Sequence, residues 1–327
     1  MDSLLATMAA DFAGSPVWFW VVFGATVTTL LALDLGVLQR RADLDNPKPM
    51  DVRSSLWLSL FYVSCGLGFG GWVWFQMGSE AGITYVTGFL VEKSLSLDNV
   101  FVISLIFGTL AIPPQYQRRV LFWGIMGAIV LRLIMIALGA ALVTSYAWVL
   151  PVFGAFLLFT GVKMLVSGHT PEDPSKSAVL IFLKKHLPVT PTLHGQKFTV
   201  RGVRADGTKG LMVTPLFLAL VMVEAADLVF AVDSVPAIFA ITSDPFIVAT
   251  SNIFAILGLR ALYFALAAMV AKFHALKPAL ALVLVFIGGK IFWAYFFGHV
   301  PAEISLSVTV ALLAGGIAAS LLRPAKA

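Results

Sequence analysis

Residues 221–238, VMVEAADLVFAVDSVPAI, carry the most informative pattern in this chain. It places three acids inside a long apolar run: Glu224, Asp227 and Asp233. A carboxylate at membrane depth costs about 2.5–3.5 kcal/mol on insertion scales, so three in one span require a reason. A related stretch, FLVEKSLSLDNVFV at residues 89–102, carries Glu92 and Asp98. The sequence therefore predicts two membrane helices that are built around acidic side chains.

The composition is that of a multi-spanning membrane protein. Of the 327 residues, 59% are hydrophobic and only 12% are charged, whereas about a quarter of a soluble domain is charged. A helical span needs about 20 apolar residues. Nine runs meet this need, at residues 17–38, 55–76, 83–109, 119–143, 146–167, 212–242, 246–270, 276–298 and 303–322. We therefore expect an all-α protein with nine transmembrane helices in one domain over residues 1–327.

The lysines and arginines predict the orientation of these spans. All but five of the 22 lie in the connectors after the first, third, fifth and seventh spans, or in the C-terminal tail. The alternate connectors and the N-terminal tail carry none. By the positive-inside rule the N-terminus lies outside and the C-terminus inside. The net charge of +5 is thus a topology signal, and we do not expect a nucleic-acid partner.

The connector at residues 168–210 is the longest polar segment. Its part KFTVRGVRADGTKG, residues 197–210, alternates around an Asp-Gly turn signal and predicts a small cytoplasmic hairpin. The connector contains no recognisable catalytic set, and its histidines lack metal-ligand spacing. The one cysteine, Cys65, excludes an internal disulfide. We therefore expect neither an enzyme nor a bound cofactor.

The five basic residues inside spans reveal a duplication. In each half, two acids six residues apart are followed by an arginine one span later and a lysine two spans later: Glu92, Asp98, Arg132 and Lys163, then Asp227, Asp233, Arg260 and Lys290. The sequences around the two lysines are also similar, FLLFTGVKML at 156–165 and LVFIGGKIFW at 284–293. This predicts a three-helix repeat, at residues 83–167 and 212–298. Because three is odd, the second copy is inverted, as in many secondary transporters.

Helical spacing predicts which polar residues share a face. Residues seven apart lie nearly in line, so Asn99 should align with Glu92, and Ser234 with Asp227. Residues six apart do not. For both acids of a pair to reach one site, the helix must loosen, and Pro236 offers such a break in the second copy.

The available ligand atoms are all oxygens. The candidate metal ligands are Glu92, Asp98, Asn99, Glu224, Asp227 and Asp233, with Ser96, Ser234 and Asp34 as additional candidates. An all-oxygen set suits Mn2+, Ca2+ or Mg2+. We expect Arg132, Arg260 and Lys290 to compensate the acids when the site is empty. The alternative is that these charges form structural ion pairs, although burying such pairs adds little stability.

Three stretches resemble signatures of the TerC family of integral membrane proteins: FLVEKSLSLDNVFVISLIF at 89–107, VMVEAADLVFAVDSVPAIFAIT at 221–242 and TSNIFAILGLRALYF at 250–264. With YQRRVLFWGIMGAIVLR, the chain looks most like the Alx-type branch. The resemblance implies a multi-pass inner-membrane protein associated with manganese export and, by name, with tellurium resistance. It also implies a distant likeness to the lysine-exporter superfamily of inverted-repeat transporters, and it adds Asn252 to the candidate site.

We therefore predict a secondary transporter that exports divalent metal ions, with Mn2+ as the expected substrate. Moving a dication out against an inside-negative potential costs about 4.6 kcal/mol per 100 mV, so a driving ion is expected, and protons suit a carboxylate site. The alternative is a membrane scaffold for stress-response or secretion partners.

Overall fold

The computed structural model describes residues 10–38, 52–146, 148–167, 175, 177–203, 208–266, 276–298 and 300–322. The helices are α2 (Val17–Leu38), α3 (Val52–Met77), α4 (Ser79–Thr109), α5 (Pro114–Ser145), α6 (Val149–Ser167), α7 (Ala178–His186), α8 (Pro215–Phe239), α9 (Pro245–Ile256), α10 (Leu259–Leu266), α11 (Leu276–Phe297) and α12 (Ala302–Leu322). Two short hairpins complete the structure, β1 (Asp11–Phe12) with β2 (Ser15–Pro16) and β3 (Thr199–Val203) with β4 (Lys209–Val213).

Every range predicted as a span contains a helix, and the protein is an integral multi-pass membrane protein. Seven helical stretches in the described residues are long and apolar enough to cross a membrane. They are Val17–Asp34, Arg53–Met77, Pro114–Ser145, Val149–Val166, Pro215–Phe239, Pro245–Ala265 and Ala302–Ser320. Helix α4 has 31 residues, but Glu92, Lys93 and Asp98 interrupt its apolar sequence. In α11 the apolar stretch is shorter, Pro278–Ala294.

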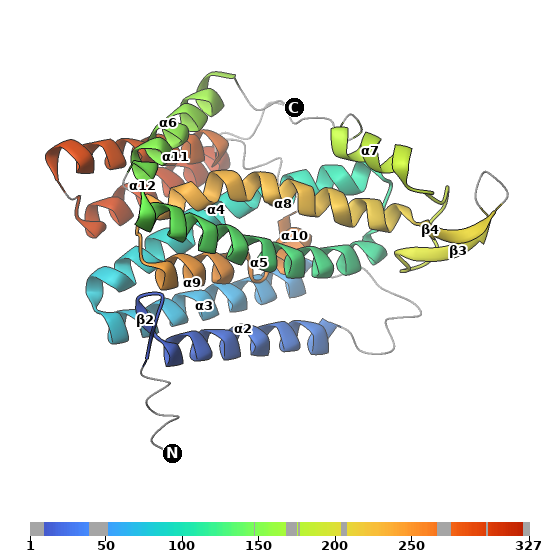
Figure 1. Cartoon of the computed structure of the whole chain (residues 1–327), viewed down its shortest axis with the longest axis horizontal. Helices are drawn as coiled ribbons and strands as arrows, with labels where there is room; N and C mark the ends of the chain where they lie inside the picture. The colour runs from blue at the N-terminus through green and yellow to red at the C-terminus, as the bar shows by residue number, and fades with distance from the viewer. Residues whose placement is uncertain are drawn as a thin grey trace, which may run out of the picture.

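The centre of the bundle is formed by α4, α5, α8 and α9 (Figure 1). Helix α4 packs on α9 and α8, and α5 packs on α8 and α9. Helices α2 and α3 cover this unit through an aromatic cluster that includes Phe19, Phe69, Trp72 and Phe246. On the other side α6 packs on α11, and α12 lies against α11 and α4. The acidic stretches thus lie at the interior of the bundle.

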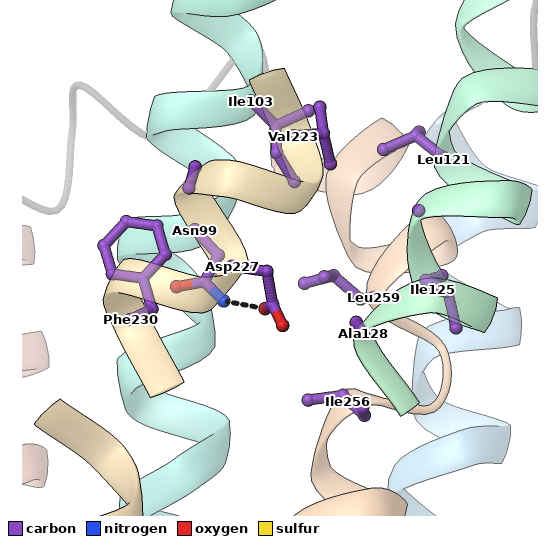
Figure 2. A pocket seen from close by; sticks show the side chains of 12 residues that line it. Asn99, Ile103, Leu121, Ile125, Ala128, Val223, Asp227, Phe230, Ile256 and Leu259 are labelled. Atoms are coloured by element: carbon purple, nitrogen blue, oxygen red, sulfur yellow. Dashed lines mark hydrogen bonds between the residues drawn. The ribbon is translucent and has the colours of Figure 1, made fainter. Parts of the chain in front are cut away.

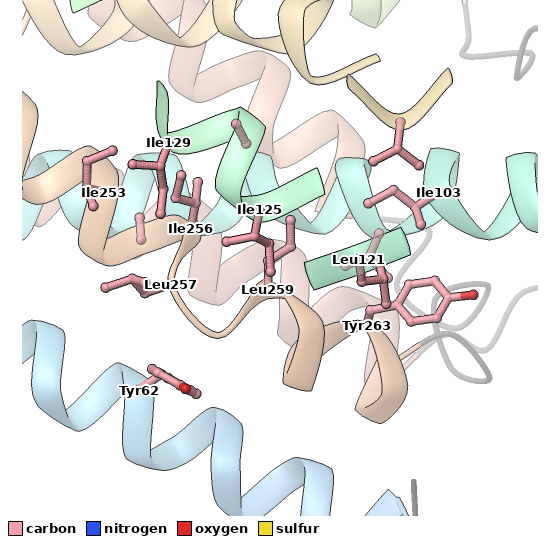
Figure 3. Close-up of a cluster of buried hydrophobic side chains, with 14 of the residues drawn as sticks. Tyr62, Ile103, Leu121, Ile125, Ile129, Ile253, Ile256, Leu257, Leu259 and Tyr263 are labelled. Atoms are coloured by element: carbon pink, nitrogen blue, oxygen red, sulfur yellow. The ribbon is translucent and has the colours of Figure 1, made fainter. Parts of the chain in front are cut away.

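The span predicted at 246–270 is not one helix. Helix α9 ends at Ile256 and α10 begins at Leu259. Gly258 between them has φ +77, and a Cβ there would lie 2.6 Å from Tyr62 of α3; only glycine suits this left-handed, crowded position. Figure 3 shows Leu257 and Leu259 on either side of this break, with Tyr62 facing it. A regular helix through this point would collide with α3.

The helix break predicted beside Asp233 is wrong. Helix α8 runs without interruption from Pro215 to Phe239, with Pro236 inside it, and α4 is equally continuous. Pro236 lacks the N–H that would bond to the Val232 carbonyl, but it is the fourth residue from the end of α8, so only the last turn of the helix follows it. Glu92 and Asp227 therefore meet at Arg132 without unwinding of either helix.

The predicted hairpin in the connector is confirmed. Strands β3 and β4 pair antiparallel, with Thr199 opposite Val213 and Val203 opposite Lys209. The predicted turn at residues 206–207 lies outside the described residues. The hairpin joins the bundle where α5 and α8 begin (Figure 1), because Arg119 of α5 lies over the Phe198 ring at 4.9 Å and the Thr214 hydroxyl donates to the Lys197 carbonyl.

Candidate functional site

Glu92 of α4 and Asp227 of α8 meet at Arg132 of α5. All three side chains are buried, with Arg132 only 1% exposed and Glu92 2%. Arg132 Nη1 pairs with Glu92 Oε1. On its other side Nη2 donates to Asp227 Oδ1 at 3.1 Å and Nε to Asp227 Oδ2 at 3.4 Å. One guanidinium therefore bridges an acid from each predicted repeat, and its two-atom grip on Asp227 uses the planar fork of arginine.

Three neutral side chains complete the network. Asn252 of α9 accepts from Arg132 Nη1 at 3.1 Å and donates to Glu92 Oε2 at 3.1 Å. The Ser234 hydroxyl accepts from Arg132 Nη1 at 3.3 Å. Asn99 Nδ2 donates to Asp227 Oδ1 at 3.4 Å. Asn99 and Ser234 are the residues that helical spacing aligned with Glu92 and Asp227, so that prediction is confirmed.

A small cavity opens beside this network. It has a volume of about 20 Å³ and is lined by Asn99, Asp227 and apolar side chains that include Ile125, Phe230 and Leu259. That space suits one water or one bare ion. Asn99 Oδ1 is buried without a hydrogen-bond partner. Figure 2 shows Asn99 and Asp227 side by side at the cavity, facing Leu259, Ile125 and Ala128.

The cavity lies toward the end of α5 that carries the connector hairpin. Its α5 residues, Leu121 to Ala128, precede Arg132 and follow the basic pair Arg118-Arg119. The positive-inside pattern of the sequence predicts that this end faces the cytoplasm. The carboxylate of Asp227 is therefore the group of the network that a small cation would meet first from that side.

Other predicted ligands lie apart from the network. Glu224, one turn before Asp227, packs its carboxylate against Gly127 of α5, and its buried Oε2 has no hydrogen-bond partner. The Ser96 hydroxyl donates to the Glu92 backbone carbonyl at 2.9 Å and so serves its own helix. Asp98 and Asp233 lie in α4 and α8, but their side chains fall outside the described residues.

Two of the three predicted charge partners contact residues outside the Arg132 network. Arg260 of α10 pairs with Asp34 of α2, Nη2 lying 2.5 Å from Oδ1 and 2.9 Å from the Asp34 carbonyl. Lys290 Nζ donates to the Ser305 hydroxyl at 3.1 Å. Only Arg132 lies between Glu92 and Asp227. Arg260 therefore compensates Asp34, which is itself one of the additional candidates, whereas Arg132 is the one of the three that compensates Glu92 and Asp227.

Lys93 is a functional candidate that sequence reasoning left without a role. Its Nζ donates to the carbonyls of Ala255 at 3.0 Å and Leu257 at 3.4 Å. These carbonyls lie at the end of α9, where helical partners are missing. The neighbouring residues Glu92 and Lys93 thus hold the same stretch of α9, one through Asn252 and the other through its open end. The sequence signal for this role is a lysine that directly follows Glu92 inside a predicted span.

The arrangement has the chemistry of a cation site whose cation is the protein's own guanidinium. Carboxylate, amide and hydroxyl oxygens from α4, α8 and α9 converge on Arg132. Within the described part of the chain, no three His, Cys, Asp or Glu side chains lie close enough to hold a metal ion. A metal ion would bind Glu92 and Asp227 together only after Arg132 had moved.

Comparison with known proteins agrees with this picture of a membrane protein. The chain is 48% identical over 311 residues to an uncharacterized membrane protein of Myxococcus xanthus, covering 95% of this chain and 93% of that protein. It is 47% identical over 304 residues to an uncharacterized membrane protein of Rickettsia bellii, covering 93% and 97%. It is 43% identical over 309 residues, 92% of each chain, to a Salmonella typhi protein named "Putative membrane-bound redox modulator Alx".

No solved structure matches the chain. The model of the family described as "Integral membrane protein TerC family" matches residues 77–327, which include all of the Arg132 network. With the match over most of the chain and relatives above 40% identity across nearly their whole length, this protein belongs to the TerC family of integral membrane proteins.

Proposed function

We propose that this protein is a secondary transporter that exports divalent metal ions, with Mn2+ as substrate, across the bacterial inner membrane. The observation that carries the proposal is the guanidinium of Arg132 between two buried carboxylates from different acidic helices. A buried charge cluster that only joined helices would add little stability. Transport would explain why the desolvation cost of these buried charges is tolerated, because the carboxylates could exchange Arg132 for a transported cation.

The binding step follows from the charges. Two carboxylates face one guanidinium, so the pair Glu92 and Asp227 exceeds Arg132 by one negative charge. A dication that enters from the small cavity meets Asp227 and the unpartnered Asn99 Oδ1. Once Arg132 swings aside, Glu92, Asn252 and Ser234 present further oxygens. Mn2+ accepts such an oxygen set, and thiolate ligands, which would favour softer metals, are not needed.

Coupling to protons would drive the cycle. Export of a dication against the membrane potential needs an opposing flow of charge. Protons that reach Glu92 and Asp227 from outside would remove the charges that hold the metal, and Arg132 would then return. Each carboxylate has an amide partner that can form a hydrogen bond with its ionised or its protonated form. The partner of Glu92 is Asn252, and the partner of Asp227 is Asn99.

The packing supports the inverted repeat and the likeness to the lysine-exporter superfamily. If residues 83–167 and 212–298 are copies, α4 corresponds to α8, α5 to α9 with α10, and α6 to α11. Helix α4 packs on α9 as α8 packs on α5, and α6 packs on α11, its own counterpart. A two-fold axis in the membrane plane would produce these pairings and would place the binding site between the copies.

The test is transport in everted membrane vesicles. Mn2+ uptake by the wild type should alkalinise the lumen, because protons leave in exchange for the metal, and it should stop with an uncoupler. Asp227→Asn and Glu92→Gln should each lower uptake by more than tenfold, while Lys163→Gln, a charge change at an exposed residue, should leave it unchanged. Mn2+ uptake that continues undiminished in Asp227→Asn would refute the carboxylate site.

The alternative function, a membrane scaffold, has one observation in its favour: the acids that face Arg132 are already paired. A scaffold would show no Mn2+ uptake, and Asp227→Asn would alter assembly with its partners and not metal tolerance. The redox role in the name of the Alx relatives does not lead to a separate proposal, because the single cysteine cannot form an intrachain disulfide.

A further inference from the structure

A second and larger cavity lies at the opposite end of the bundle. Its volume is about 290 Å³, and it is enclosed by the start of α4, the end of α8, α11 and α12. Its polar lining includes Glu80, Thr84, Thr242, Ser243, Lys290 and Ser305. This end is remote from the basic connector, and the charge pattern places it outside. The Arg132 network has no hydrogen bond to this lining among the described residues.

We propose that this cavity is the outward vestibule through which the hydrated dication leaves, and that Lys290 prevents the ion from being retained there. The inference rests on the proposed export function. The six waters of a hydrated ion need roughly 90 Å³ of cavity space, since one water needs about 10–15 Å³. The outer cavity can therefore hold the hydrated ion, whereas the inner cavity of about 20 Å³ can hold only a bare one.

The charge of Lys290 sets the affinity of this vestibule. Glu80 and several hydroxyl groups would attract a dication, as the lining of a binding site does. Lys290 is half-buried and is held by Ser305 of α12 at 3.1 Å, so its ammonium stays at the cavity wall. A fixed positive charge a few ångströms away weakens the binding of a dication by about tenfold or more. Its counterpart in the first repeat, Lys163, is exposed.

A thin seal separates the vestibule from the Arg132 network. Gly88 of α4 is packed so closely that a Cβ there would lie 3.1 Å from Ile238 Cδ1 of α8 and 3.1 Å from Ser251 Oγ of α9. Phe239, which lines the vestibule, is packed against Gly139 of α5. These contacts pack α4, α5, α8 and α9 closely between the two cavities, and the inner cavity reaches Asp227. An ion on its way out would cross this layer.

Thiol accessibility tests the vestibule without any transport assay. In a Cys65→Ser background, Ser305→Cys and Thr84→Cys should react in whole cells with a membrane-impermeant methanethiosulfonate reagent added outside. Ser251→Cys, on the sealed side, is the matched control and should react at least tenfold more slowly. If Ser305→Cys and Thr84→Cys are no more reactive than Ser251→Cys, the cavity is not an outward vestibule.

Charge reversal tests the role of Lys290. In Lys290→Glu, external Mn2+ should slow the labelling of Thr84→Cys, which leaves the Ser305 hydroxyl in place, at concentrations about tenfold or more below any effect in the Lys290 parent, and export should be slower. Lys290→Arg should behave as the parent, and Lys163→Glu is the control for added acid. Unchanged Mn2+ protection in Lys290→Glu would overturn the proposal. A protein that shows this protection but transports no Mn2+ would refute the export function alone.

Discussion

Arg132 and Arg260 hold corresponding places in the two halves of the chain, yet their partners differ. Arg132 bridges Glu92 and Asp227, one acid from each acidic helix. Arg260 pairs with Asp34 of α2, a helix outside both predicted repeats. In the proposed function, a cation that competes for Glu92 and Asp227 displaces Arg132. The ion pair of Arg260 with Asp34 holds the peripheral helix α2. Two arginines at equivalent points of the predicted repeat therefore have different partners, one within the site and the other in a peripheral helix.

The largest effect is expected from removing Arg132. Arg132→Ala leaves two carboxylates buried together, and uncompensated buried charge costs about 3–5 kcal/mol. The thermal unfolding midpoint of the purified protein in detergent should fall sharply. Adding Glu92→Gln should recover part of the loss, because one of the stranded charges disappears. A midpoint in Arg132→Ala equal to that of the wild type would show that Arg132 does not neutralise this site.

The next largest effect is expected at Gly258, in the break between α9 and α10. Gly258→Ala introduces a Cβ at positive φ and 2.6 Å from Tyr62, for which overpacking of about 1–3 kcal/mol is expected in addition to about 1–2 kcal/mol for the left-handed backbone. Gly68→Ala in α3 has open space around its Cβ and is the control. Equal unfolding midpoints for the two variants would contradict a crowded break at Gly258.

A smaller loss should follow from breaking the anchor. Asp34→Asn keeps the backbone carbonyl that accepts from Arg260 but removes the charge, which should lower the free energy of unfolding by about 1–3 kcal/mol. Mn2+ uptake should remain within twofold of the wild type, in contrast to Glu92→Gln. A tenfold loss of uptake in Asp34→Asn would mean that both arginine sites take part in transport and that the contrast between them fails.

The smallest loss of stability is expected at the N-cap of α9, the helix that carries Asn252. The Asp244 carboxylate accepts from the Phe246 and Ile247 amides at 2.9 and 3.3 Å. Burial raises the pKa of Asp244 above its usual value, against these hydrogen bonds. Asp244→Ala should cost about 1 kcal/mol, whereas Asp244→Asn keeps the accepting oxygen and should be nearly neutral. Thermal unfolding of the two variants measures the difference, and equal losses would argue against the cap.

Much of the candidate site could be predicted because helical geometry is local. Seven-residue spacing on α4 and α8 correctly placed Asn99 with Glu92 and Ser234 with Asp227, since side chains two turns apart share a face. The paired order of acids, arginines and lysines likewise predicts that the halves correspond, and this stays a prediction. The position of Glu224 could not be predicted, because its spacing from Asp227 does not reveal that Gly127 of α5 leaves room for its carboxylate.

The amino-acid sequence was sufficient to identify a helical membrane protein and the oxygens and cations within its spans, because the bilayer sets the length and polarity of a span. The partners of the buried charges were visible only in the folded chain: Arg132 joins Glu92 to Asp227, Arg260 pairs with Asp34, and Lys93 binds the end of α9. These partners come from helices far apart in the chain, and the packing between those helices brings them together.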